Sequence, residues 1–578
     1  RVNKYQEKCE MLDRHLEKWI VPLTEEVLRF HAVKMSNHVF DDDETKNTSS
    51  KAISALAMHQ TSKVLHAFAT VRGAKTIARF FPHSARDLEP AIKTLRRFMP
   101  KRDGSAAKYE VAGFWDRYQP GTRETLTEEV ASESLFETSW ETRATLLSWI
   151  SVLVLMPFDM KTFVKTTTTT FDNSAEGGVG GGSSSNSSSG DENKAGLIED
   201  LLGMCRQCVS FAEVARDRAA ICVARLLTRP DAELNLGEYL DWSSSELMRV
   251  FGRKKAGEEE STKDKIAEAV AASEDSFVAV GATRSMAAIF KIGRRDVLKP
   301  FRESALKASQ AVFDAKTPLA SSSFGSRTTT SNALTRQLAC KLSARVALTL
   351  LAPKVVSWRY ARGSRNLAEN LLNNENANTK EEESVDIVDD NTDDNGFAAD
   401  DETDEASLDQ LEKAIDLLLE ALKDTDTIVR WSAAKGIGRI CQRLPKQFAD
   451  DVVENLLSSC FKATESESTW HGACLALAEL SRRGVLLVTR LPFAAEKTAA
   501  ALLYDVRRGS HSVGAHVRDA AAYVCWSFAR AYSKSDFQEV FLGSLATPLL
   551  VTSCFDREVN VRRAASAAFQ ECIGRLGG

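Results

Sequence analysis

A short sequence pattern recurs four times in the last quarter of the chain at a nearly constant spacing. The copies are centred on Arg430, His471, Arg518 and Arg562, so that successive centres lie 41, 47 and 44 residues apart. A period of about 40 to 47 residues is typical of HEAT and armadillo arrays, in which each pair of helices buries its apolar face against the next pair. The period therefore predicts an all-α fold, a HEAT/armadillo-like helical-repeat superhelix (α-solenoid), with no strands in the last 150 residues.

The segment before the first copy predicts the partner helix of that repeat. Leucine and isoleucine recur there at helical spacing. These residues are Leu408, Leu411, Ile415, Leu418, Leu419 and Leu422. Ser407, with Gln410 three residues later, is a capping box that would start this helix. Asp424 or Asp426 would cap the next helix through its free N–H groups.

The repeated arginine lies on the apolar side of its helix. At about 100° per residue, apolar side chains share the faces of Arg430, Arg518 and Arg562. They are Val429, Ala433, Ala434, Ile437 and Ile440 for the first, Ala521, Val524, Cys525 and Phe528 for the second, and Ala565, Phe569 and Ile573 for the third. A guanidinium group on an apolar face has to be paired, so we expect these arginines to be structural and held by turn carboxylates such as Asp426 and Asp556. His471 stands at the arginine position and is interpreted as a core histidine.

The side chains opposite the apolar faces are the candidates for binding a partner, because a stacked array leaves them open. Tyr523, Ser527 and Arg530 lie opposite Arg518, and a long connector with the sequence Arg507-Arg508-Gly509 precedes that helix. The predicted partner-binding residues are Lys435, Arg439, Arg443, Arg507, Arg508, Tyr523 and Arg530. The alternative is that each is an ordinary solvated side chain without a partner.

Several runs are more distinctive than the repeat pattern itself. They are Trp431-Ser-Ala-Ala-Lys-Gly-Ile-Gly-Arg439, Trp470-His-Gly-Ala-Cys-Leu-Ala-Leu-Ala-Glu-Leu480, Tyr504-Asp-Val-Arg-Arg-Gly509, Val517-Arg-Asp-Ala-Ala-Ala-Tyr-Val-Cys-Trp-Ser-Phe-Ala-Arg530 and Arg562-Arg-Ala-Ala-Ser-Ala-Ala-Phe-Gln570. Upstream, Val71-Arg-Gly-Ala-Lys-Thr76 and Thr228-Arg-Pro-Asp231 are weaker echoes. Together these runs resemble the tubulin-folding cofactor D family, also called tubulin-specific chaperone D.

The resemblance implies a cytoplasmic, cytoskeleton-associated scaffold. Members of this family bind β-tubulin and help to assemble or disassemble the α/β-tubulin heterodimer, together with tubulin cofactors C and E and an ARF-like small GTPase. Their assembly stimulates GTP hydrolysis, with the nucleotide on the partners. Family members are also longer, so we expect this chain to be a fragment without the C-terminal half. The alternative function is a generic HEAT-repeat adaptor, of the transport-receptor or phosphatase-scaffold type, with unrelated protein cargo.

Composition divides the chain into five segments. Residues 1–165 and 196–372 are predicted to be N-terminal and middle helical repeats, and residues 406–578 are the repeats that carry the family motifs. Residues 166–195, rich in Thr, Gly and Ser, and residues 373–405 are predicted to be disordered inserts. The stretch 381–405 holds 13 acidic and no basic residues, so that the rest of the chain has 75 basic and 67 acidic residues, a net charge of +8. This insert is interpreted as a solubilising loop, or alternatively as a competitor that covers the basic inner surface.

Other function classes find little support in the sequence. It has no His-Glu-x-x-His and no phosphate-binding loop ending in Gly-Lys-Ser/Thr, and Gly436-Ile-Gly438 is interpreted as a close-packing site within a helix. Cys205 and Cys208 lack a second Cys/His pair at zinc spacing, so no metal or cofactor is predicted. Eleven cysteines, mostly in apolar helical contexts, indicate reduced core thiols. The excess of basic residues is small, and aromatic residues are not interleaved with them as nucleic-acid binding would require. No apolar run is long enough to span a membrane.

Overall fold

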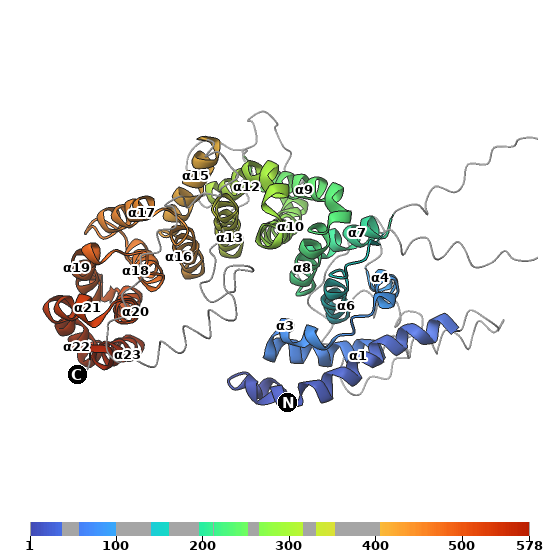
Figure 1. The fold of residues 1–578 in the computed structure, drawn as a ribbon, viewed down its shortest axis with the longest axis horizontal. Helices are drawn as coiled ribbons and strands as arrows, with labels where there is room; N and C mark the ends of the chain where they lie inside the picture. The colour runs from blue at the N-terminus through green and yellow to red at the C-terminus, as the bar shows by residue number, and fades with distance from the viewer. Residues whose placement is uncertain are drawn as a thin grey trace, which may run out of the picture. The chain divides into compact units, whose positions relative to one another are not determined.

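The computed structural model describes residues 2–36, 57–99, 140–160, 196–211, 213–252, 265–315, 331–352 and 405–576. These residues form two compact units, one made of residues 1–294 with 314–331 and the other of residues 295–313 with 332–578. The helices of both units are drawn in Figure 1. The two predicted inserts, 166–195 and 373–405, lie outside the described residues except for Glu405.

The first unit consists of helices packed in successive pairs. Its α-helices are α1 (Asp13–Ser36), α3 (Ala74–Ile77), α4 (Leu88–Arg97), α6 (Trp140–Leu153), α7 (Leu197–Val209), α8 (Ala215–Leu227), α9 (Glu233–Phe251) and α10 (Lys265–Ile292), and a further helical stretch covers residues 57–68. Helices α6, α8 and α10 pack side by side in chain order, and α4, α7 and α9 pack against them. A buried arginine joins neighbouring layers, because Arg143 of α6 donates to the Phe98 carbonyl at 3.0 Å and to Glu213 at 2.7 Å.

The second unit is a two-layered array of the predicted kind. Its elements are α11 (Arg295–Leu298), α12 (Arg302–Asp314), α13 (Ala333–Leu350), α15 (Glu405–Ala421), α16 (Thr427–Cys441), α17 (Lys446–Ser459), α18 (Glu467–Arg482), α19 (Leu491–Leu502), β1 (Val506–Arg508), β2 (His511–Val513), α20 (Ala515–Ala531), α21 (Lys534–Val540), α22 (Ala546–Phe555) and α23 (Val559–Leu576). Helices α13, α16, α18, α20 and α23 pack in succession as one layer, and α15, α17, α19 and α22 lie against them as the other. The all-α repeat fold predicted from the period is confirmed.

One expectation about this region was wrong in detail. Strands β1 and β2 form an antiparallel hairpin, with Val506 opposite Val513 and Arg508 opposite His511, in the long connector before α20. The connector is the only described part of the last 150 residues that contains strands. It joins two helices of the array and replaces neither of them.

Two turns, one containing Asp424 and the other Asp556, hold neighbouring repeats together. We call each of these aspartates, with the arginines that bind to it, an aspartate clasp. The carboxylate of Asp424 accepts from Arg336 of the preceding repeat at 2.9 Å, and its carbonyl accepts from Arg430 of its own repeat at 2.6 Å. Asp556 accepts from Arg518 of the preceding repeat at 2.5 Å, and its carbonyl accepts from Arg562. Each clasp therefore provides an acceptor for two guanidinium groups on apolar faces, one from each side of the repeat boundary.

The clasp corrects the predicted partner of Arg430. The carboxylate of Asp426 pairs with Arg336, not with Arg430. Arg430 instead donates to the carbonyls of Asp424 and Thr425 and, through Nε, to Nδ1 of His471 at 2.9 Å. His471 is buried, as predicted for a core histidine. Asp556 does hold one of the repeated arginines, as predicted for a turn carboxylate, because it pairs with Arg518.

The helical-wheel faces are mostly confirmed, with three exceptions. Ser527, predicted to be open, is fully buried and donates to the Tyr523 carbonyl, whereas Ile573, predicted to be buried, is exposed near the end of α23. Leu408 is also exposed.

The capping predictions were wrong, because Ser407 lies inside α15 and the side chain of Asp426, at the N-cap of α16, makes no capping hydrogen bond.

Candidate protein-binding surface

Helix α18 is covered by the helices on either side of it. It lies between α16 and α20 in the layer, and every residue from Thr469 to Ser481 is buried. The small residue Gly472 lets it approach the end of α15 in the other layer, because a Cβ at this position would lie 2.0 Å from the carbonyl oxygen of Leu422. The ring centroids of Trp431 on α16 and Tyr523 on α20 are 5.7 Å apart. The two rings therefore meet over α18.

These rings belong to a row of aromatic side chains with a cation at each end, which we call the cationic–aromatic strip (Trp431, Lys435, Tyr523, Trp526 and Arg530). Tyr523 stacks on Trp526 with centroids 5.9 Å apart. The ammonium group of Lys435 lies 4.9 Å from the Trp431 ring centroid, and the guanidinium of Arg530 lies 4.7 Å from that of Trp526. Cations over partly exposed rings interact with the ring quadrupole and still present charge to solvent.

A buried carboxylate lies beside the strip. The side chain of Glu479 accepts from Arg482 at 2.8 Å and from Arg483 at 3.1 Å, and the Tyr523 hydroxyl lies 3.5 Å from it. Burial raises the pKa of Glu479, but the hydrogen bond and positive charges of Arg482 and Arg483 outweigh burial and hold that pKa below its ordinary value. Glu479 is therefore ionised at neutral pH, and it fixes the position of the Tyr523 ring from below.

Arg439 and Arg443 lie beyond the strip, at the C-terminal end of α16. Arg439 is exposed and Arg443 is half-buried. Both are close to further arginines that the sequence reasoning did not single out, Arg345 of α13 and Arg295 of α11. The electrostatic contacts in this group are repulsive, because Arg439 lowers the pKa values of both Arg345 and Arg443 in addition to the effect of burial.

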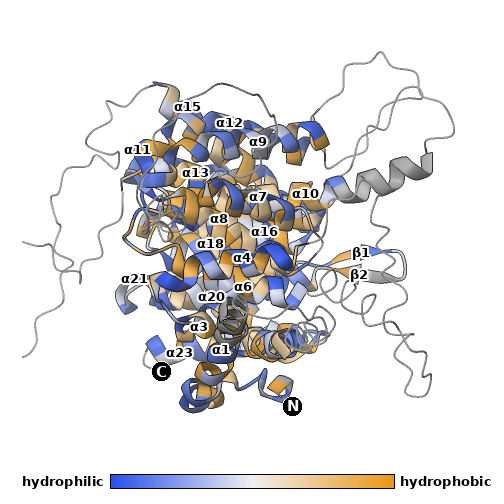
Figure 2. Cartoon of the chain, turned by 90° about the vertical axis from the view of Figure 1, so that its right-hand side faces the viewer, coloured by the Kyte–Doolittle hydropathy of each residue, from blue (hydrophilic) through white to orange (hydrophobic). Residues whose placement is uncertain are grey.

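Arg507 and Arg508 lie elsewhere, on the exposed hairpin. Residues 505–510 are all exposed, and Gly509 has a φ of 61°, the left-handed conformation that this turn requires. Figure 2 shows the hairpin projecting from the helices. It precedes the N-terminus of α20, whereas Arg530 lies near the C-terminus of the same helix, about 24 Å away at 1.5 Å per residue.

The predicted residues are thus divided among three places. Lys435, Tyr523 and Arg530 come together in the strip, Arg439 and Arg443 join two other arginines, and Arg507 and Arg508 are on the hairpin. Trp431 and Trp526 were missed, although both fall within the distinctive runs and Trp526 follows Tyr523 by one helical turn. A search for aromatic residues as well as charges at this spacing would have found them.

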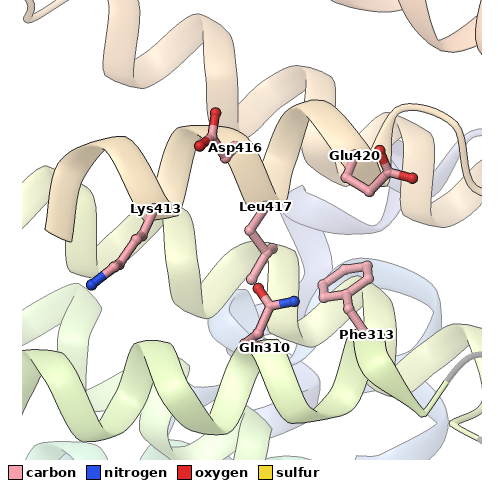
Figure 3. A pocket seen from close by; sticks show the side chains of 6 residues that line it. All are labelled: Gln310, Phe313, Lys413, Asp416, Leu417 and Glu420. Carbon is pink, nitrogen blue, oxygen red and sulfur yellow. The ribbon is translucent and has the colours of Figure 1, made fainter. Parts of the chain in front are cut away.

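The described residues also include a shallow groove and two buried cysteines outside the strip. A shallow groove between α12 and α15 is lined by Gln310, Phe313, Lys413, Asp416, Leu417 and Glu420, side chains that Figure 3 shows along the two helices. Lys413 is already paired with Asp409 at 2.5 Å. The described residues contain no cluster of three or more His, Cys, Asp or Glu side chains that could hold a metal ion. Cys205 and Cys208 are buried, and burial raises the pKa of Cys208 to about 12.

Paired helices in two layers, with a cation-rich aromatic strip on one of them, define a helical-repeat protein of the armadillo or HEAT class. Two family models match the chain: the "Tubulin-specific chaperone D-like, ARM repeat" model over residues 2–247 and the "Tubulin-specific chaperone D-like, ARM repeats" model over residues 334–578. The chain belongs to the tubulin-specific chaperone D-like family, as its distinctive runs predicted. No helix among the described residues is long and apolar enough to cross a membrane.

Two curated relatives agree with this family. Tubulin-specific chaperone D of Dictyostelium discoideum is 27% identical over 615 aligned residues, which cover 100% of this chain and 39% of the relative. Tubulin-folding cofactor D of Schizosaccharomyces pombe is 39% identical over 178 residues, 28% of this chain and 16% of the relative. The chain therefore spans well under half the length of either. Among solved structures, the karyopherin Kap121p bound to RanGTP matches 98% of this chain and 46% of its own, at 10% identity and a TM-score of 0.39.

Proposed function

We propose that this chain is a tubulin-binding part of a tubulin-folding cofactor. It captures β-tubulin and helps to assemble or disassemble the α/β-tubulin heterodimer, together with cofactors C and E and an ARF-like small GTPase. The family membership supports this role, and the two relatives carry tubulin in their names. The chain acts in the cytoplasm in association with the cytoskeleton. It performs no chemistry itself, and any stimulated GTP hydrolysis takes place on the nucleotide of its partners.

The cationic–aromatic strip is the observation that carries the proposal. Its five side chains come from two helices that both lie within the distinctive runs, and its aromatic rings are partly exposed next to two cations. Aromatic side chains flanked by positive charge are typical of binding hot spots, since the rings supply apolar contact area and the charges select an acidic partner. The strip thus suits a folded acidic protein better than a small molecule.

Retention of purified α/β-tubulin on the immobilised chain tests the proposal. We expect Trp431→Ala and Lys435→Glu each to weaken retention at least about tenfold. Lys435 is exposed, so that Lys435→Glu leaves α18 covered and reports on binding apart from folding. Helix α19, in the other layer, offers a matched control, because its Lys497 lies 4.6 Å from the ring centroid of the exposed Phe493. Phe493→Ala and Lys497→Glu should bind tubulin like the unmodified chain.

Two results would contradict the proposal. If the unmodified chain retains no tubulin, the function is wrong. If the strip variants and the α19 variants lose tubulin equally, the tubulin surface lies elsewhere. Retention of an unrelated acidic protein of similar size with equal affinity would favour the generic adaptor instead.

A further inference from the structure

A small cavity in the first unit is lined by side chains of the helical stretch 57–68, α3, α6 and α8. Its volume is about 20 Å³, enough for one water-sized group such as the end of a side chain. Most of its lining is apolar, and the polar side chains that border it are His66, Thr145, Ser148 and Arg218. A few polar groups in an apolar lining are typical of a site that recognises one kind of ligand group.

The distinctive run Val71–Thr76 shapes one wall of this cavity. The chain forms a turn of π-helix over Ala69–Gly73, and Gly73 has a φ of 97°, a conformation that favours glycine. Ala69, which begins the π-turn, and Ala74, which begins α3, both line the cavity with small side chains. Turns of π-helix occur often at functional sites, and this one belongs to a run that the cationic–aromatic strip does not use.

Two polar groups that border the cavity have hydrogens to donate and no acceptor. Thr145 of α6 is 6% exposed, and its hydroxyl makes no hydrogen bond with the described residues. The half-buried Arg218, in the first turn of α8, likewise has no hydrogen bond or ion pair among them. Ser148, by contrast, already donates to the Ala144 carbonyl at 2.7 Å. Since a desolvated donor without an acceptor costs free energy, this pair of donors favours an acceptor in the cavity.

The cavity has the charge of a single cation. Burial and, second, the charge of Arg218 lower the pKa of His66, so that this imidazole is neutral at neutral pH. The His66 ring is fixed at the border of the cavity, because it meets the ring of Trp140 edge-on with centroids 4.8 Å apart. Among the described residues that line the cavity, Arg218 is then the only charged side chain, and Asp217 beside it pairs with Arg284 at 2.6 Å. A singly charged anion therefore suits the cavity better than a doubly charged phosphate, which would keep a second charge without a partner.

We propose that this cavity binds the carboxylate of an aspartate or glutamate side chain that a protein partner presents. The carboxylate accepts from the Arg218 guanidinium and the Thr145 hydroxyl, and the methylene groups next to it lie against apolar lining residues such as Leu65 and Ile77. The cavity is too small to enclose a whole ligand. A free carboxylate therefore gains little affinity there, whereas a side chain of a bound protein adds to a larger interface. The inference rests on the proposed function only in that tubulin is the partner tested.

Sodium acetate is the direct probe, added to the full chain in exchange for chloride at constant ionic strength. The chain carries carbon-13 at Cε1 of its histidines, and the ring resonance of His66 is assigned by its loss in His66→Gln. We expect acetate to shift this resonance saturably and phosphate to shift it much less. Arg218→Gln should abolish the shift, and Thr145→Val should weaken acetate binding about tenfold.

Arg97→Gln is the matched control for the loss of charge. Arg97 is exposed on α4 of the same unit and does not line the cavity. The His66 resonance of this variant should respond to acetate like that of the unmodified chain. Tubulin retention then tests whether a protein supplies the carboxylate, because Arg218→Gln should weaken retention about tenfold and Arg97→Gln should not change it.

A thermal-unfolding measurement separates binding from a structural role. Arg218 lies at the positive N-terminal end of α8, so Arg218→Gln should leave the Tm unchanged or raise it. A lowered Tm would overturn the inference, as would a His66 resonance that ignores acetate or that phosphate shifts equally. Equal tubulin retention by Arg218→Gln and Arg97→Gln would also overturn it, and these failures leave the proposed function intact while the unmodified chain retains tubulin. A response to acetate in a chain that retains no tubulin leaves the site standing and removes the proposed function.

Discussion

The contact between Arg430 and His471 makes the second unit sensitive to acid at one point. Nε of Arg430 donates to Nδ1 of His471 at 2.9 Å, so that this nitrogen must carry no proton. His471 is 5% exposed. Burial, the charge of Arg430 and the nearby His516 lower the pKa of His471 from 6.5 to about 3. A proton on this ring would place two positive charges against each other in the interior.

The sign and size of the effect follow from this lowered pKa. Stability from the neutral ring is fully present above the unfolded pKa of 6.5 and is lost as the pH falls from 6.5 toward 3. At pH 5 the unfolded state binds the proton and the folded state does not. The free energy of unfolding is then smaller by about 2 kcal/mol than at pH 7. This corresponds to an equilibrium constant for opening that is about thirtyfold larger.

Hydrogen exchange of the amides in α16 and α18 measures this opening locally, after correction for the intrinsic pH dependence of exchange. We expect the opening constant of these amides to rise about thirtyfold between pH 7 and pH 5. The variant His471→Gln keeps an acceptor for Arg430 but does not titrate, so that its opening constant should change much less. If both chains show the same pH dependence, or if the imidazole of His471 titrates near its ordinary pKa in the folded chain, the reasoning is refuted.

Three further predictions concern packing, a buried ion pair and the exposed hairpin. Gly472→Ala should lower the free energy of unfolding by about 3 kcal/mol, because the new methyl group collides with the Leu422 carbonyl. Gly574→Ala should raise it by about 0.5 kcal/mol, because no atom lies within 4 Å of the added Cβ. Chemical denaturation measures both changes, and equal effects would argue against the close approach of α18 to α15. Arg518→Glu should lower the free energy of unfolding by at least about 3–5 kcal/mol, since it removes the guanidinium that pairs with the buried Asp556 and puts a second carboxylate beside it. Charge reversal at Arg507 and Arg508 on the exposed hairpin should leave the Tm nearly unchanged and weaken tubulin retention; a lowered Tm with normal retention would show that the hairpin is structural.

The repeat period and the helical wheel were enough to predict the array and most of its buried faces. They apply because each helix pair buries its apolar side against neighbours of the same kind, so that local spacing determines burial. The partner of Arg430 could not be predicted in the same way. Two arginines, one from each side of the repeat boundary, compete for the same turn, and the sequence does not indicate which one reaches Asp426.

The candidate site was predicted only in part, for a related reason. Trp431 and Tyr523 meet across an intervening helix because Gly472 lets that helix lie deeper, and a wheel drawn for one helix contains no information about the depth of the next. The proximity of Arg295 to Arg443 likewise could not be predicted from the repeat pattern, because the two residues are 148 positions apart in the sequence. Spacing within a repeat identified which residues are open to solvent. The distances between repeats determine which of these residues lie next to one another.

The aspartate clasp has a consequence for how such arrays change in length during evolution. Asp424 and Asp556 each accept from one arginine of the repeat before and from one arginine of their own repeat. A duplication or deletion that runs from one clasp to the next leaves every guanidinium group with an acceptor. A cut that separates such an aspartate from one of its two arginines leaves a buried charge without that acceptor. Descendants of this chain can therefore gain or lose material here in whole repeats, and the genetic unit of change is the interval between two such aspartates.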